Sequence, residues 1–313
     1  MQFKKPLFWD KKFSVWKYIL LPFSFIYFLL SKINFKKKHT VTNIFSICVG
    51  NIYVGGTGKT PTCVLIKKNL EKLNIKSSFI KKYYPDQIDE QNLLRKYGDL
   101  FIEKNRLSGL INSKEKGYRI AIFDDGLQDK SINYNLKIVC FNSESFIGNE
   151  NLFPSGPLRE KITAIKKYDA VFLNGLNYNN KKNIDKLKNT NPNINIFETV
   201  YKIKNNENLN KSSKYLIFAG IGNPINFLNL LNDNGINVVN KVFYPDHYNY
   251  TEKDIDKIKN ISLKKNLKII TTEKDYYRLK ESMRENIDYI KIELSLKNEN
   301  EFIIFLKSKI WKN

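Results

Sequence analysis

Apolar runs alternate along most of the chain with stretches whose apolar residues recur at helical spacing. Runs of β-branched and aromatic residues predict strands at 44–49, 77–80, 100–102, 118–123, 136–141, 170–173, 214–219 and 268–272. Stretches with an apolar and a polar side predict helices at 60–73, 91–97, 106–113 and 224–232. Strands that alternate with helices are typical of a mainly parallel sheet between helical layers. The pattern therefore predicts an α/β sandwich.

The most apolar part of the chain lies near its N-terminus. Residues 18–30 carry no charge and would form a helix about 20 Å long, at ~1.5 Å per residue. This length is short for a bilayer core of roughly 30 Å, and Pro22 weakens the helix further. Lysines flank the run on both sides, and nearby aromatic residues suit the headgroup layer.

Three interpretations of this N-terminal segment compete. A cleaved signal peptide fits poorly, because no small-residue cleavage site follows the apolar run. A helix buried in a core remains open. We favour a helix that lies in, or dips into, the cytoplasmic face of a membrane, where the flanking lysines would meet anionic lipid headgroups.

Composition changes this picture only slightly. The chain has 313 residues, 42% of them hydrophobic, which is enough for a core and for two domains. Cys48, Cys63 and Cys140 lack disulfide or metal-ligand spacing and are expected to be buried thiols. The net charge of +22 suits an acidic partner, but a lysine- and asparagine-rich composition typical of A+T-rich genomes explains it equally well. Arginine-rich stretches interleaved with aromatic residues are absent, so we expect no nucleic-acid partner.

The stretch Val-Gly-Asn-Ile-Tyr-Val-Gly-Gly-Thr-Gly-Lys-Thr-Pro at 49–61 joins a predicted strand to a predicted helix. This order of strand, glycines, Lys-Thr pair and helix is the layout of a phosphate-binding loop. The glycines let the backbone close around phosphate oxygens, and the helix points its positive end at the anion. Lys59 can reach the outer phosphates, and the Thr60 hydroxyl can ligate magnesium. The expected nucleotide-binding residues are Gly55, Gly56, Thr57, Gly58, Lys59, Thr60 and Pro61.

An acidic pair follows a second apolar strand. The strand at 118–123 ends in Asp124-Asp125-Gly126. A carboxylate at the end of an apolar strand, downstream of a phosphate loop, fits a Walker B aspartate that holds magnesium. A polar turn that closes the strand is the alternative. With the loop upstream, we expect Thr60, Asp124 and Asp125 to hold Mg²⁺.

Seven segments together resemble the tetraacyldisaccharide 4'-kinases, the lipid A 4'-kinases of Gram-negative bacteria. They occur in the order of the family and span nearly the whole chain: 49–61, FDDGLQ (123–128), FPSGPLRE (153–160), DAVFLNG (169–175), FAGIGNP (218–224), FYPDHYNYTEKD (243–254) and TTEKD (271–275). Tyr53 stands where the full loop pattern has a glycine, and the family also lacks that glycine. The apolar N-terminal helix is similar to the family's membrane-associated helix.

The resemblance implies a function. The family transfers the γ-phosphate of ATP to the 4'-hydroxyl of tetraacyldisaccharide 1-phosphate and so gives lipid IVA. It implies ATP and Mg²⁺ as cofactors, the lipid A precursor and anionic inner-membrane lipids as partners, and the cytoplasmic face of the bacterial inner membrane as location. The alternative is a membrane-associated regulatory P-loop ATPase of the partitioning or targeting type. The Pro-Asp-His motif at 245–247 argues against that alternative.

The resemblance also implies catalytic residues, which are Lys59, Asp89 and His247. In the family, an aspartate of a Gly-Asp-Glu-Pro-like motif acts as base and the histidine of Pro-Asp-His assists it. Asp89-Glu90 matches the spacing of the first motif, although Ile88 and Gln91 replace its glycine and proline. Asp99, which follows Gly98, is a competing match, and Asp89 has the alternative of capping the 91–97 helix.

The expected substrate contacts are Arg159, Asp125 and Gln128. A guanidinium at position 159 can bind a phosphate bidentately, or it can form a surface ion pair with Glu160 or a neighbour. Two departures from the family affect this region. Ile-Lys-Lys-Tyr-Tyr at 80–84 replaces Ser-Arg-Gly-Tyr, and Asp129 replaces the histidine after Asp-Asp-Gly-x-Gln.

The implied fold is a P-loop NTPase-like three-layer sandwich with a second, smaller α/β lobe and an N-terminal membrane-associated helix. We expect a membrane-associated segment at 1–35 and a P-loop kinase domain at 36–198. A second lobe at 199–296 would include a two-stranded linker formed by 197–203 and 289–294. A C-terminal helix at 297–313 would return to the first domain. The Asn- and Lys-rich stretches 176–191 and 204–213 are expected to be surface connections.

Overall fold

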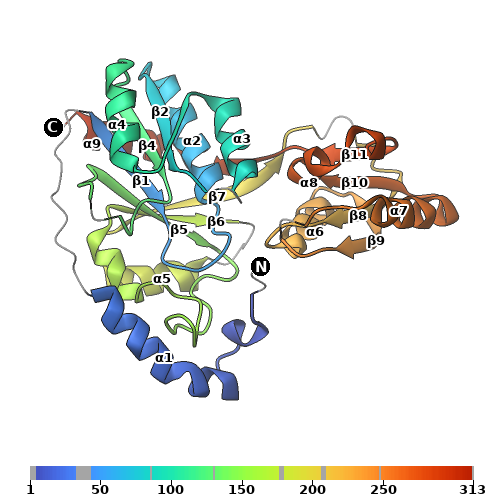
Figure 1. Ribbon diagram of the computed structural model, residues 1–313, viewed down its shortest axis with the longest axis horizontal. Coiled ribbons are helices and arrows are strands. Elements are labelled where there is room, and N and C mark those ends of the chain that lie inside the picture. Colours follow the sequence, from blue (N-terminus) through green and yellow to red (C-terminus); the bar gives the residue numbers. More distant parts are fainter. Residues whose placement is uncertain are drawn as a thin grey trace. The chain divides into compact units, whose positions relative to one another are not determined.

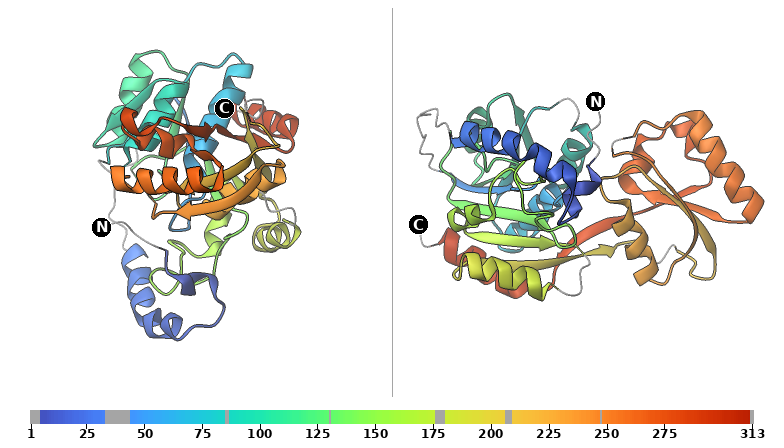
Figure 2. Two further views of the ribbon diagram at one scale, coloured as in Figure 1. Left: turned by 90° about the vertical axis from the view of Figure 1, so that its right-hand side faces the viewer. Right: turned by 90° about the horizontal axis from the view of Figure 1, so that it is seen from below.

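The computed structural model describes residues 5–32, 44–84, 87–129, 131–175, 180–205, 209–246 and 248–311 (Figures 1 and 2). The chain divides into two compact units. The larger consists of Pro6–Val200 and Leu294–Asn313, and the smaller is built on Tyr201–Glu293. His247, one of the expected catalytic residues, lies outside the described residues.

The larger unit is organised around an eight-stranded sheet with the order β12-β7-β6-β5-β1-β4-β2-β3. Its strands are β1 (Phe45–Gly50), β2 (Ser77–Lys82), β3 (Leu100–Glu103), β4 (Ile120–Asp124), β5 (Leu136–Asn142), β6 (Ala170–Asn174), β7 (Asn195–Ile203) and β12 (Ile292–Leu296). Neighbours from β7 to β3 pair in parallel. The central strands are buried almost throughout, as expected for a parallel sheet covered on both faces.

Most helices of the larger unit lie in the connections between these strands, while the first precedes β1 and the last follows β12. They are α1 (Val15–Lys32), α2 (Lys59–Lys72), α3 (Ile88–Tyr97), α4 (Arg106–Glu115), α5 (Lys181–Thr190) and α9 (Glu299–Ile310). The expectation of a surface connection at 176–191 is wrong, because α5 occupies most of it. Ile184 and Leu187 form a narrow apolar stripe that packs on the core, and the surrounding asparagines and lysines hide this stripe in the composition.

The smaller unit contains a four-stranded parallel sheet with the order β11-β10-β8-β9. The elements are β8 (Lys214–Ala219), α6 (Pro224–Asp233), β9 (Asn237–Phe243), α7 (Glu252–Lys265), β10 (Lys268–Thr272), α8 (Glu273–Arg278) and β11 (Ile287–Ile290). Side chains of β8 alternate between two cores, since Phe218 packs with Ile258 of α7 while Ile217 packs with Phe227 of α6. Helices therefore cover both faces of this sheet as well.

The N-terminal helix α1 runs along the outside of the larger unit (dark blue in Figures 1 and 2). Ser24, which is buried, contacts the segment 152–155 twice: its Oγ donates to Leu152 O (2.9 Å) and accepts from Ser155 N (2.9 Å). Most large apolar side chains of the helix are exposed, so the core-helix alternative does not hold. Among the helices that the structure describes, none combines the length and apolar character needed to cross a membrane.

The three cysteines are buried free thiols, as expected.

Candidate active site

The phosphate-loop sequence connects the carboxyl end of β1 to the amino end of α2. Gly58 is the N-cap of α2 and adopts a left-handed conformation (φ 80°, ψ 24°), and Gly55 also has a positive φ of 127°. Both conformations favour glycine because it has no Cβ. Gly58 offers no side chain to cap the helix, so the first backbone N–H groups of α2 point into the loop without a side-chain acceptor. This arrangement is suited to an anion.

The first half of the loop is held by the segment 157–159. Val54 N donates to Pro157 O (2.7 Å), and Arg159 N donates to Ile52 O (2.7 Å). Tyr53 forms an antiparallel bridge with Leu158, and its side chain is buried in the core. Tyr53 therefore anchors the loop at the position where the full sequence pattern has a glycine.

Two asparagines hold the second half of the loop, and the sequence pattern gave neither a role. Asn174, at the end of β6, donates from Nδ2 to Thr57 O (2.8 Å) and to Thr62 Oγ1 (3.0 Å). Asn51 donates to Gly55 O (3.2 Å). The signal that could have identified them is their place at the ends of buried strands, inside the segments 169–175 and 49–61.

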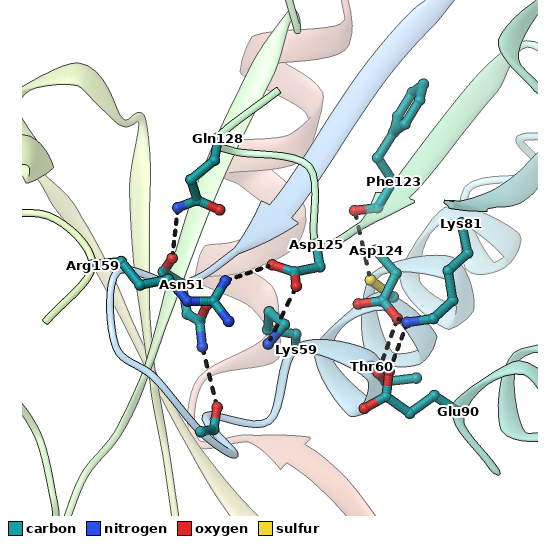
Figure 3. A network of polar contacts seen from close by, with 12 residues as sticks. Asn51, Lys59, Thr60, Lys81, Glu90, Phe123, Asp124, Asp125, Gln128 and Arg159 are labelled. Atoms are coloured by element: carbon teal, nitrogen blue, oxygen red, sulfur yellow. Dashed lines mark hydrogen bonds and ion pairs between the residues drawn. The ribbon is translucent and has the colours of Figure 1, made fainter. Parts of the chain in front are cut away.

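Asp124 lies beside the loop because β1 and β4 are parallel neighbours, with Val49 opposite Asp124. Thr60 Oγ1 donates to Asp124 Oδ2 (3.0 Å), as Figure 3 shows. Asp124 is 1% exposed, and burial raises the pKa of its carboxyl group while Lys81 and Lys59 act in the opposite direction. Within the described part of the chain, its Oδ1 is buried without a hydrogen-bond partner, as is Thr57 Oγ1.

Asp125 lies between two cations. Its Oδ2 is 3.9 Å from Lys59 Nζ, and its Oδ1 is 3.7 Å from Arg159 Nη1 (Figure 3). Burial alone would raise the pKa of this carboxyl, but Lys59 and Arg159 outweigh that effect and hold it below the usual value. The residue has a positive φ of 60°, and Arg106 Nη2 donates a hydrogen bond to its carbonyl oxygen. The structure thus brings Lys59, Asp125 and Arg159 together.

Lys81 also contacts Asp124, and the sequence pattern gave it no role in the site. It is 1% exposed, and its Nζ donates to Asp124 Oδ2 (2.6 Å) and to Glu90 Oε2 (2.6 Å) (Figure 3). The only signal in the sequence is the replacement of the usual Ser-Arg-Gly-Tyr by Ile-Lys-Lys-Tyr-Tyr at 80–84.

Asp89 lies in the first turn of α3, next to Glu90. The helix begins at Ile88 with Gln87 as N-cap, so Asp89 is not the capping residue. The competing candidate, Asp99, lies beyond the end of α3 and accepts a hydrogen bond from the Tyr118 hydroxyl. That hydrogen bond raises the pKa of Tyr118 to about 12. Asp99 is thus bound to Tyr118 within the fold. Asp89 is followed by Glu90, which contacts Lys81.

Gln128 and Asp129 both contact the framework of the site. Gln128 Nε2 donates to Asn51 O (2.9 Å) and to Glu160 Oε1 (3.2 Å). Asp129 accepts from Arg106 Nη1 (3.1 Å), and its pKa is lowered because hydrogen bonds from Ser131 and the charge of Arg106 outweigh its partial burial. Glu160 thus contacts Gln128, whereas Arg159 faces Asp125.

Known proteins resemble this chain over nearly its whole length. A model of the tetraacyldisaccharide-1-P 4'-kinase family matches residues 16–310. The chain is 48% identical to tetraacyldisaccharide 4'-kinase of Pelagibacter ubique over 96% of both chains, and 32% identical to that of Rickettsia canadensis over 98% of this chain and 96% of the relative. The crystal structure of LpxK from Aquifex aeolicus in complex with ATP has the same fold, with a TM-score of 0.67 and 22% identity over 94% of this chain and 99% of that one. The chain belongs to the tetraacyldisaccharide-1-P 4'-kinase family.

Proposed function

We propose that the chain transfers the γ-phosphate of ATP to the 4'-hydroxyl of tetraacyldisaccharide 1-phosphate and so gives lipid IVA in lipid A biosynthesis. Membership of the family supplies the acceptor and the position of transfer. The observation that carries the proposal is a phosphate loop beside a buried carboxylate, Asp124, whose Oδ1 has no partner among the described residues. The relatives match over nearly their whole length, so a regulatory ATPase is not favoured.

On the donor side, we assign the phosphates of ATP to the loop from Gly55 to Pro61 and to the first N–H groups of α2. Lys59 would leave Asp125, which lies 3.9 Å away, and pair with the β- and γ-phosphates. Thr60 and Asp124 offer hydroxyl and carboxylate oxygens, which are the donors that Mg²⁺ prefers, and Asp125 adds a third. Asp124 Oδ1, which has no hydrogen-bond partner among the described residues, supports this fit. When bound, Mg²⁺ would neutralise charge on the phosphate oxygens.

On the acceptor side, we assign Asp89 as the base that accepts the proton of the sugar hydroxyl, with assistance from His247. Phosphoryl transfer depends mainly on positioning and charge neutralisation, so a weakly basic carboxylate at the right place is sufficient. The side chain of Arg159 is 31% exposed, faces Asp125 and is available to bind a phosphate of either substrate. Gln128 supports the loop through the carbonyl of Asn51.

We further propose that α1 lies on the cytoplasmic face of the inner membrane and contacts anionic lipids. Large side chains that are more than half exposed cover much of its surface: Trp16, Tyr18, Ile19, Phe23, Phe25, Ile26 and Leu30. Lys11 and Lys12 precede the helix and are exposed, and Lys161 Nζ lies 4.6 Å from the ring centre of Phe28. An apolar surface edged by lysines suits an anionic membrane interface.

The test of the catalytic proposal is an assay of the purified chain with ATP, Mg²⁺ and tetraacyldisaccharide 1-phosphate in detergent. We expect a product with an added phosphate at the 4'-position, detected by mass spectrometry. Asp89→Ala should lose most turnover, and Asp99→Ala should retain it. Absence of product from the wild-type chain would rule out the proposed function, and normal turnover by Asp89→Ala would rule out the assigned base.

The membrane proposal is tested by sedimentation with lipid vesicles. The wild-type chain should bind vesicles that contain phosphatidylglycerol and bind neutral phosphatidylcholine vesicles less. The double variant Phe23→Ser, Phe25→Ser should bind less in both cases, since both side chains are exposed. Leu263→Ser, which removes an exposed leucine of α7 in the smaller unit, is the matched control. Equal binding by the double variant and the control variant would contradict the assignment of α1.

A further inference from the structure

Lys81 carries a charge into the interior of the larger unit. It lies on β2, which pairs in parallel with β4 so that Lys81 stands opposite Asp124. Its side chain is 2% exposed, and two of its three N–H donors are used by Asp124 Oδ2 and Glu90 Oε2, each at 2.6 Å. Lys81 therefore joins two carboxylates that belong to different elements.

The surroundings keep this ammonium charged. Burial alone would lower the pKa of Lys81, but the negative charges of Asp124 and Glu90 outweigh burial and raise it above the usual value. A buried lysine with two carboxylates gains little stability over apolar side chains of similar size, because each charge loses its hydration. Stability alone therefore does not explain why Lys81 is buried between Asp124 and Glu90. The position of these three residues in the site is more informative.

Asp124 lies on the donor side of the proposed reaction, beside the phosphate loop, and Glu90 lies on the acceptor side, beside Asp89. Asp124 contacts Thr60, which follows Lys59 at the end of the phosphate loop. Glu90 is in the first turn of α3, directly after Asp89. That turn has no side-chain N-cap hydrogen bond, so the Lys81–Glu90 contact supplies a charged attachment where a cap is missing.

We propose that Lys81 is a positioning residue that ties the acceptor-side helix α3 to the donor-side carboxylate Asp124. By holding Glu90 it fixes the first turn of α3, and with it the backbone of Asp89. By holding Oδ2 of Asp124 it fixes the direction of the remaining oxygen, Oδ1. This inference rests on the proposed kinase function, since its consequence for catalysis requires Asp89 to act on the acceptor.

The first test compares Lys81→Met with Lys81→Arg in the kinase assay. A displacement of the base by about 1 Å can cost roughly 10²-fold in rate, so we expect Lys81→Met to lower kcat by about that factor. The KM for ATP should change far less than kcat, because the hydrogen bonds from Val54, Asn51 and Asn174 that hold the phosphate loop do not involve Lys81. Lys81→Arg keeps a cation with several donors and should recover part of the loss.

Lys67→Met is the matched control. Lys67 is also buried in the larger unit, where its Nζ donates to Ser77 O (2.9 Å) and pairs with Glu71 (3.0 Å). It lies against the far end of α3, since a Cβ built on Gly98 would be 2.3 Å from Lys67 Cε. Its loss should lower the melting temperature but leave kcat near the wild-type value. An equal fall of kcat in both methionine variants, or a wild-type kcat in Lys81→Met, would overturn the proposal.

Hydrogen exchange gives a readout that does not depend on activity. Amides of α3 should exchange faster in Lys81→Met than in the wild type, while those of α2 keep their rates. Unchanged exchange in α3 would also overturn the inference. If Lys81→Met does not fold, Glu90→Gln, which weakens the same attachment from its exposed side, decides by the same two measurements. A wild-type chain without kinase activity would refute the proposed function, whereas normal variants of an active wild type would refute only the role of Lys81.

Discussion

Each unit has a buried aspartate at, or shortly after, the carboxyl end of a parallel strand, and the two aspartates differ in what their carboxylate oxygens contact. Asp124 ends β4 of the larger unit, and Asp275 lies in the first turn of α8, after β10 of the smaller unit. Both are at most 1% exposed. Both belong to segments that resemble the family, and both have a threonine and a cation as partners.

The hydrogen bonds of Asp275 are complete. Its Oδ2 accepts from Gly220 N (3.1 Å) and Thr272 Oγ1 (2.7 Å), and its Oδ1 accepts from the Tyr250 hydroxyl (3.0 Å) and Arg278 Nη1 (3.1 Å). In Asp124 only Oδ2 has such partners within the described residues. Contacts within the fold account for a carboxylate with every acceptor position used, whereas a buried oxygen without a partner calls for another explanation, such as the Mg²⁺ that we propose. Membership in a family motif alone does not distinguish these two cases.

The largest expected effect is that of Asp124→Asn on turnover. If Asp124 holds Mg²⁺ at the transferred phosphate as we propose, the loss of its charge should lower kcat by about 10³-fold. The free energy of unfolding should also fall, because the buried Lys81 loses one of its two carboxylate partners, while Glu90 still pairs with it. Turnover and chemical denaturation of the same preparation measure both. If Asp124→Asn unfolds easily but turns over at the normal rate, Asp124 has a structural role and not a catalytic one.

Asp275→Asn should lower stability without lowering turnover. The substitution leaves Arg278 buried beside an amide and offers an N–H group to donors, so the smaller unit should lose about 3–5 kcal/mol of stability. Turnover of the molecules that remain folded should stay near the wild-type value. Thermal unfolding followed together with kinase activity at low temperature separates the two quantities. A large fall in kcat without loss of stability would contradict the structural role of Asp275.

The sequence predicts the fold that surrounds both aspartates. Long apolar strands and the phosphate loop are local patterns, and the parallel α/β fold follows from them, whereas the family follows from the resemblance of seven segments. The thiols of Cys48, Cys63 and Cys140 were also correctly expected to be buried. The functions of the individual site residues stay predictions, because neither the fold nor the relatives test them.

What the sequence does not reveal depends on contacts between distant segments. Lys81 follows an apolar run and precedes another lysine, and its burial depends on the pairing of β2 with β4. Asn174 is followed by a glycine and has the local pattern of a turn, although it holds Thr57 across 117 positions. The helix α5 needs only two apolar positions because the core supplies the opposing surface.

Asp125 is the intermediate case, and its pH dependence gives the smallest expected effect. Asn tolerates the left-handed backbone at this position, so Asp125→Asn removes the charge without strain. The pKa of Asp125 is lowered in the folded protein, so its contribution to stability is present above the pKa of the unfolded chain and is lost as pH falls through the folded value. Ion pairs of 3.7 and 3.9 Å at a partly exposed site should contribute about 1 kcal/mol or less.

We therefore expect the stability difference between wild type and Asp125→Asn to be largest near neutral pH and to shrink as the pH falls below about 4. It should also shrink in concentrated salt, which screens partly exposed charges. Denaturation curves across pH 3–7 at two salt concentrations measure both trends. A difference that grows toward acid pH would mean that burial, and not Lys59 and Arg159, controls this carboxylate. The pKa of Asp125 would then be controlled by burial, as that of Asp124 is. Its ion pair with Lys59 would be weak, and bound phosphate would displace it easily.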